Sequence, residues 1–88
     1  MAQERNLRAS VRRYLNARKP ELKWWPGTGS KGMPDINVIY HGNYYGVELK
    51  TKTGRLSVIQ EAEREKILAA GGRYVVPRSV EDVRRTFE

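Results

Sequence analysis

Three charged residues near the middle of the chain have the types and the spacing of a metal-assisted hydrolytic site. Glu48 and Lys50 stand two residues apart in a β-prone run, and Asp35 begins the β-prone run before it. Because side chains alternate between the two faces of a strand, Glu48 and Lys50 are predicted to project from one face, with Val47 and Leu49 on the other. Two charged residues on one face of an otherwise apolar strand call for an explanation.

A metal ion would explain the two carboxylates. If the runs form an antiparallel hairpin, the carboxylate of Asp35 comes to lie beside that of Glu48, and the two repel each other. A divalent cation removes this conflict and gains two hard oxygen ligands. It can then polarise a phosphate and activate a bound water, while Lys50 orients that water or offsets charge on the phosphorane. The alternative is that Glu48 and Lys50 are solvated and that Asp35 caps the strand entry.

The composition limits the chemistry further. The chain has 88 residues, from which we expect one domain spanning 1–88, and it has no cysteine and a single histidine, His41. Disulfides and thiolate metal sites are therefore excluded, a zinc cluster is not expected, and the oxygen ligands favour Mg²⁺ or Mn²⁺. We give His41 itself only the role of an exposed turn residue.

The charge balance points to a polyanionic partner. Lysine and arginine number 17 against 10 acidic residues, a net charge of +7, which is typical of a nucleic-acid-binding protein, although a merely basic surface explains the charge equally well. No stretch has the length and apolarity of a membrane span or a signal peptide. We therefore expect a cytoplasmic protein without membrane partners. The compactness of the chain suits a phage-encoded protein that acts in the cytoplasm of its bacterial host.

The hydrophobic periodicity predicts the element order α-β-β-β-α-β-α. We expect an α/β (α+β) fold with a four-stranded mixed sheet flanked by helices. Ser57 with Gln60 three residues later has the form of a capping box, and Ser79 is predicted to cap the last helix. The predicted helices cover residues 4–17, 57–70 and 79–87, and the predicted strands cover residues 22–25, 36–40, 44–50 and 74–76. The residues between the middle strands, 41–43, read as a tight hairpin turn.

Several short motifs together resemble VRR-NUC domains of the PD-(D/E)XK nuclease superfamily, in particular the stand-alone viral type. They are residues 32–35 (Gly-Met-Pro-Asp), residues 48–50 (Glu-Leu-Lys), Leu56-Ser57 with Gln60, and residues 74–79 followed by Asp82-Val83. The resemblance covers nearly the whole chain. It implies a restriction-endonuclease-like αβββαβ core, similar to that of the Holliday junction resolvases in the same superfamily.

The resemblance also implies an activity and roles for named residues. The activity is Mg²⁺- or Mn²⁺-dependent hydrolysis of phosphodiester bonds, with Asp35 and Glu48 as metal ligands and Lys50 as the catalytic lysine. Glu4 matches an acidic position on the first helix that lies near the metal in related nucleases, and helical geometry places it on the core-facing arc. Gln60 would hold a water or the lysine at the active site, besides any part in the capping box.

DNA contacts are expected from basic residues around this site. The loop of residues 27–32 runs directly into Pro34-Asp35, so we interpret it as a contact for the DNA backbone, although a plain linker is the competing interpretation. The residues predicted to contact DNA are Ser30, Lys31, Lys52, Arg55, Arg8 and Arg12. Trp24 and Trp25 are predicted to be one core and one surface aromatic. Glu63 and Lys66 fall within the apolar arc of the second predicted helix, where a dimer contact would explain them.

The predicted function is a structure-directed DNA endonuclease that acts on branched DNA such as Holliday junctions. A homodimer is expected because a small α/β domain has a thin core and because two identical sites could cut two strands of a junction. The alternatives are a non-catalytic nucleic-acid-binding module and a nuclease subunit that needs a partner protein.

Overall fold

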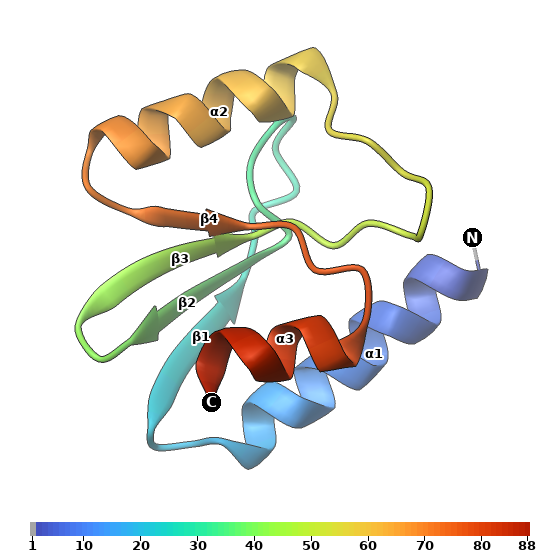
Figure 1. The fold of residues 1–88 in the computed structure, drawn as a ribbon, viewed down its shortest axis with the longest axis vertical. Helices are drawn as coiled ribbons and strands as arrows, with labels where there is room; N and C mark the ends of the chain where they lie inside the picture. Colours follow the sequence, from blue (N-terminus) through green and yellow to red (C-terminus); the bar gives the residue numbers. More distant parts are fainter. Residues whose placement is uncertain (1) are drawn as a thin grey trace.

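A computed structural model of the protein describes residues 2–88. It contains three helices and a four-stranded sheet (Figure 1). The elements, in chain order, are α1 (Ala2–Ala17), β1 (Leu22–Pro26), β2 (Ile36–Tyr40), β3 (Asn43–Val47), α2 (Val58–Ala69), β4 (Arg73–Val75) and α3 (Val80–Phe87). The predicted α/β (α+β) fold and its element order are confirmed. None of the helices described within residues 2–88 is long and apolar enough to span a membrane.

The sheet is mixed, with the strand order β1-β2-β3-β4. The first three strands form an antiparallel meander, and β4 pairs with β3 in parallel. Strand β3 ends at Val47, three residues earlier than the sequence predicts. Beyond that point the amide of Glu48 still bonds to the carbonyl of Val75 at 3.0 Å, but the amide of Leu49 turns to the side chain of Asp35 at 2.9 Å. The carboxylate therefore takes the place of a backbone partner and ends the β2–β3 ladder.

The hydrophobic core lies on one face of the sheet, where α1 and α3 pack side by side (Figure 1). The apolar stripes of both helices meet the inward residues of the strands there. The core residues are Val11, Tyr14, Leu15, Leu22, Ile36, Val38, Val47, Leu49, Val83 and Phe87. Trp24 packs against this core while Trp25 is exposed, which confirms the predicted division of the two tryptophans.

The turn between β2 and β3 is shorter than predicted. Tyr40 and Asn43 pair across the hairpin, so the loop contains only His41 and Gly42. Both have positive φ angles, of 51° and 80°, which is the requirement of a type I′ turn. His41 is exposed at this turn, as expected. The turn fixes the register of β2 against β3, which places the start of β2 opposite the end of β3.

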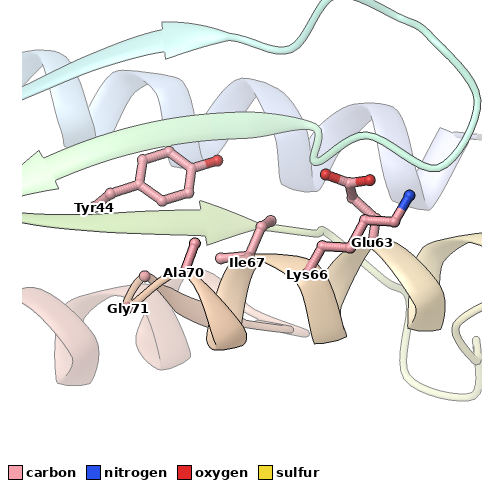
Figure 2. A pocket seen from close by; sticks show the side chains of 7 residues that line it. Tyr44, Glu63, Lys66, Ile67, Ala70 and Gly71 are labelled. Carbon is pink, nitrogen blue, oxygen red and sulfur yellow. The ribbon is translucent and has the colours of Figure 1, made fainter.

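Helix α2 covers the opposite face of the sheet, lying against β4 (Figure 1). It covers that face lightly, because none of residues 58–69, all of which the structure describes, is fully buried. Trp25 and Ile39, on β1 and β2, remain exposed at 38% and 40%. A cavity of about 430 Å³ separates the helix from the sheet, and the side chains of Tyr44 and Ile67 face into it (Figure 2).

Candidate active site

Asp35 and Glu48 lie opposite each other at the ends of paired strands. Ile36 and Val47 are partners in the β2–β3 register, so the residues immediately outside them are Asp35 and Glu48. The backbone carbonyl of Asp35 accepts a hydrogen bond from the Gly27 amide at 2.8 Å, and its side-chain Oδ2 accepts from the Leu49 amide. The backbone on both sides therefore holds Asp35 in place, and the predicted hairpin juxtaposition is confirmed.

The Glu48 carboxylate is buried, with only 3% of the residue exposed. Burial raises its pKa to about 7, and the nearby charge of Asp35 acts in the same direction, while Lys50 opposes both. One oxygen, Oε2, accepts a hydrogen bond from Gln60 Nε2 at 2.8 Å and lies 4.0 Å from Lys50 Nζ. This contact confirms that Glu48 and Lys50 project from the same side of the chain.

The other oxygen of Glu48 fits a metal ligand. Within residues 2–88, Oε1 is buried and has no hydrogen-bond partner. A buried carboxylate oxygen without a partner is costly, and a cation beside Asp35 would satisfy it. No cluster of three or more Asp, Glu, His or Cys side chains suitable for a metal occurs in the described part of the chain. Two carboxylates suit Mg²⁺, which keeps several waters and is commonly held by one or two carboxylates plus phosphate.

Gln60 completes the predicted capping box, and its side chain also contacts the carboxylate pair, at Glu48 rather than at the lysine. Ser57 is the N-cap of α2, and the capping box is complete: Gln60 Oε1 accepts from the Ser57 amide at 2.8 Å, and Ser57 Oγ accepts from the Gln60 amide at 3.1 Å. The other end of the same amide group donates to Glu48 Oε2. The start of α2 therefore positions a hydrogen-bond donor at the carboxylate pair.

Glu4 reaches this site only through Arg8. The Arg8 guanidinium lies 3.5 Å from a carboxylate oxygen of Glu4 and 3.5 Å from Asp35 Oδ1. The side chain of Glu4 is 46% exposed, so it is not buried at its position on the predicted core-facing arc. The first turns of α1 extend beyond the sheet, so this arc of the helix is only partly covered there (Figure 1).

A polar cavity of about 230 Å³ opens beside the two carboxylates. Asp35, Glu48 and Gln60 line it on one side, and Arg8 and Arg12 line it from α1. The loop after β1 closes the cavity with residues that include Ser30. Of the other predicted DNA contacts, Lys31, Lys52 and Arg55 are exposed outside the cavity lining. The cavity is thus lined by acidic side chains on one side and, on the other, by Arg8 and Arg12, which together are called the basic wall.

Comparison with solved structures is informative about the fold. One structure, described as a "VRR_NUC domain", superposes with a TM-score of 0.75, covering 94% of this chain and 91% of that chain at 22% sequence identity. The chain has the VRR_NUC fold. No protein-family model and no curated protein matches the sequence. The resemblance recognised in the sequence motifs is therefore confirmed in the fold.

Within this VRR_NUC fold, β4 brings one further side chain, Tyr74, near the carboxylates. Burial, together with the nearby charges of Glu48 and Asp35, raises the pKa of the Tyr74 hydroxyl to about 12, although the charge of Arg64 acts in the opposite direction. The Tyr74 hydroxyl is buried and has no hydrogen-bond partner within residues 2–88. In the sequence, Tyr74 reads as part of an apolar strand and of the motif at residues 74–79, neither of which indicates that its side chain lies beneath α2.

Proposed function

We propose that the chain is a metal-dependent DNA endonuclease that hydrolyses phosphodiester bonds. The observation that carries the proposal is the buried carboxylate of Glu48, placed beside Asp35 with one oxygen that has no hydrogen-bond partner among residues 2–88. Asp35 and Glu48 would hold Mg²⁺ or Mn²⁺. When bound, the cation supplies charge neutralisation and an activated water. The VRR_NUC fold supports a nuclease over a purely structural role for the pair.

The protein side chains divide the remaining work. Lys50, which is largely buried and 4.0 Å from Glu48, offsets negative charge on the phosphate under attack. Gln60 fixes the orientation of the Glu48 carboxylate through its hydrogen bond to Oε2. Arg8 joins Glu4 to Asp35 and faces the cavity, so Glu4 supports the site through Arg8 and would reach a cation only after a change of side-chain conformation.

The basic wall provides the DNA-binding surface. Arg8 and Arg12 line the cavity beside the carboxylates, and Ser30 and the exposed Lys31 belong to the loop at its edge. Such contacts bind the phosphate backbone, so they position DNA without reading its sequence. With a net charge of +7 on 88 residues, we expect binding that weakens steeply with salt and depends on the shape of the DNA.

We further propose a homodimer that acts on branched DNA. Helix α2 covers only part of the sheet face on which it lies, and Trp25 and Ile39 are exposed on that same face. A second copy related by a two-fold axis would cover this face. Glu63 and Lys66 border the cavity along α2 (Figure 2), and a two-fold axis would place Glu63 of one copy against Lys66 of the other. Two sites in one particle could cut two strands of a four-way junction.

The experiment that tests the function compares DNA substrates of equal length and sequence composition. Labelled four-way junction, flap and linear duplex are incubated with the protein in Mn²⁺, in Mg²⁺ and in EDTA. We expect cleavage only with a cation, fastest on the junction. The Asp35→Asn protein should bind the same DNA without cutting it. Binding by the wild-type protein without cleavage of any substrate would favour a nucleic-acid-binding module or a subunit that requires a partner.

A further inference from the structure

Arg78 holds the loop that follows Lys50. A single nitrogen of its guanidinium, Nη1, donates to the backbone carbonyls of Thr51 at 2.6 Å, Gly54 at 2.7 Å and Lys52 at 3.3 Å. These carbonyls belong to residues 51–55, named here the 51–55 loop. The loop also contains a tight turn, closed by the Gly54 amide bonding to the Thr51 carbonyl at 3.1 Å. A permanently charged, planar guanidinium in contact with three carbonyls fixes the loop conformation from one point.

The backbone around Arg78 is fixed on both sides. The amide of Lys50 donates to the carbonyl of Pro77 at 3.3 Å, which ties the segment to the candidate active site. The amide of Arg78 donates to Asp82 Oδ2 at 2.9 Å, which ties it to the first turn of α3. This amide is the main cause of a lowered pKa for Asp82, so the carboxylate stays charged. Arg78 therefore connects the chain after Lys50 to a helix of the core.

The 51–55 loop presents two basic side chains to solvent, Lys52 and Arg55. A cavity of about 210 Å³ lies between the loop and α1, and its lining includes Gln3, Lys52 and Arg78. The α1 residues that line this cavity are followed along the helix by Arg8, which contacts Asp35. The loop thus borders α1 at Gln3 and Leu7, close along the helix to Arg8 of the basic wall.

We infer that Arg78 is a positioning residue for substrate DNA, because it holds Lys52 and Arg55 at a fixed offset from Lys50 and so makes the 51–55 loop a second contact for the phosphate backbone. This inference rests on the proposed function. The physical reason is entropic: basic side chains on a loop that is already ordered bind phosphate without first restricting the loop. Arg78 itself need not touch DNA.

The test measures binding of a fluorescein-labelled four-way junction in EDTA over a series of salt concentrations. The proteins are wild type, Arg78→Ala, the Lys52→Ala/Arg55→Ala double variant and the triple variant. Arg78→Ala is expected to weaken binding several-fold and to reduce the slope of log K against log salt by up to about 1.8, since each phosphate contact contributes about 0.9. The triple variant is expected to bind like the double variant. If Arg78→Ala weakens binding as much in the double variant as in the wild type, Arg78 does not act through the loop.

Three controls separate positioning from charge and from folding. Arg13→Ala removes the same charge from the far side of α1, and an equal loss of slope there would overturn the inference. Arg78→Lys keeps the charge on a shorter, flexible side chain without the planar guanidinium, so it should also lose slope. Amide hydrogen exchange should accelerate in the 51–55 loop of Arg78→Ala and stay unchanged in the sheet; unchanged exchange in the loop would contradict positioning. Binding is measured without cleavage, so the two proposals can fail separately. If junction binding depends on Arg78 but the protein cuts no DNA, only the proposed function is overturned.

Discussion

The side-chain amide of Gln60 links the N-terminus of α2 to the buried carboxylate of Glu48. Its oxygen accepts from the Ser57 backbone amide, and its nitrogen donates to Glu48 Oε2, both at 2.8 Å. Because the helix cap fixes one end of the amide group, the other end is already oriented before any substrate binds. Part of the candidate active site is therefore ordered by secondary structure.

This double role predicts different effects for two neighbouring substitutions. Ser57→Ala removes the cap but leaves the Glu48 contact, so it should lower the free energy of unfolding by about 1 kcal/mol and change cleavage little. Gln60→Ala should lower stability at least as much and also slow cleavage, because a hydrogen bond to a charged group is lost. Urea unfolding and single-turnover cleavage measure the two effects. Equal cleavage rates for the two variants would show that the Gln60–Glu48 bond has no catalytic importance.

Folding stability in the absence of cation should depend on Glu48 in a defined pH range. Its pKa is raised from 4.5 to about 7, so the folded state holds the proton more tightly than the unfolded chain. The associated stability is fully present below pH 4.5 and is lost as the pH rises through 7. Relative to Glu48→Gln, which is always neutral, the wild type should lose on the order of 2 kcal/mol between pH 5 and pH 8. Urea unfolding in EDTA measures this difference, and parallel pH profiles would contradict it.

Two tyrosines offer a matched comparison of hydroxyl groups. The Tyr74 hydroxyl is buried and has no hydrogen-bond partner in the part of the chain that the structure describes, whereas the Tyr44 hydroxyl donates to Asn37 Oδ1 at 2.6 Å. Tyr74→Phe should therefore leave the free energy of unfolding unchanged or raise it. Tyr44→Phe should lower it by about 1 kcal/mol. Thermal or urea unfolding distinguishes them, and a loss in Tyr74→Phe as large as that in Tyr44→Phe would refute the difference.

The proposed dimer can be tested by exchanging charges on α2. In a two-fold contact, Glu63→Lys places like charges against Lys66 of the other copy and should shift the protein to monomer. Adding Lys66→Glu to the same chain restores opposite charges and should restore the dimer. Sedimentation at micromolar concentration measures the state of each protein. A monomeric wild type, or a double variant no better than Glu63→Lys, would contradict the proposed interface.

The sequence was sufficient to predict that Asp35 and Glu48 meet at the end of one hairpin. The exact register depends on the turn at His41 and Gly42, which is one residue shorter than predicted. The same reasoning failed for Glu4, since an angle around a helix says nothing about how far the helix extends beyond the sheet. The contact between Gln60 and Glu48 depends on where α2 crosses the sheet, and the Arg78 contacts depend on a loop returning to a distant segment. Neither contact leaves a local sequence pattern. The motifs therefore identified Gln60 as a site residue but could not identify Glu48 as its partner.

The central claim, that the buried carboxylate pair is a metal-dependent hydrolytic site, is tested most directly by a single-turnover cleavage measurement in Mn²⁺. Glu48→Gln and Glu61→Gln remove the same charge, but Glu61 is exposed on the first turn of α2. We expect Glu61→Gln to cleave labelled junction DNA at the wild-type rate. Glu48→Gln should lose at least about 100-fold, since a metal ligand contributes several kcal/mol to stabilising the transition state. Cleavage by Glu48→Gln at the wild-type rate would contradict the account.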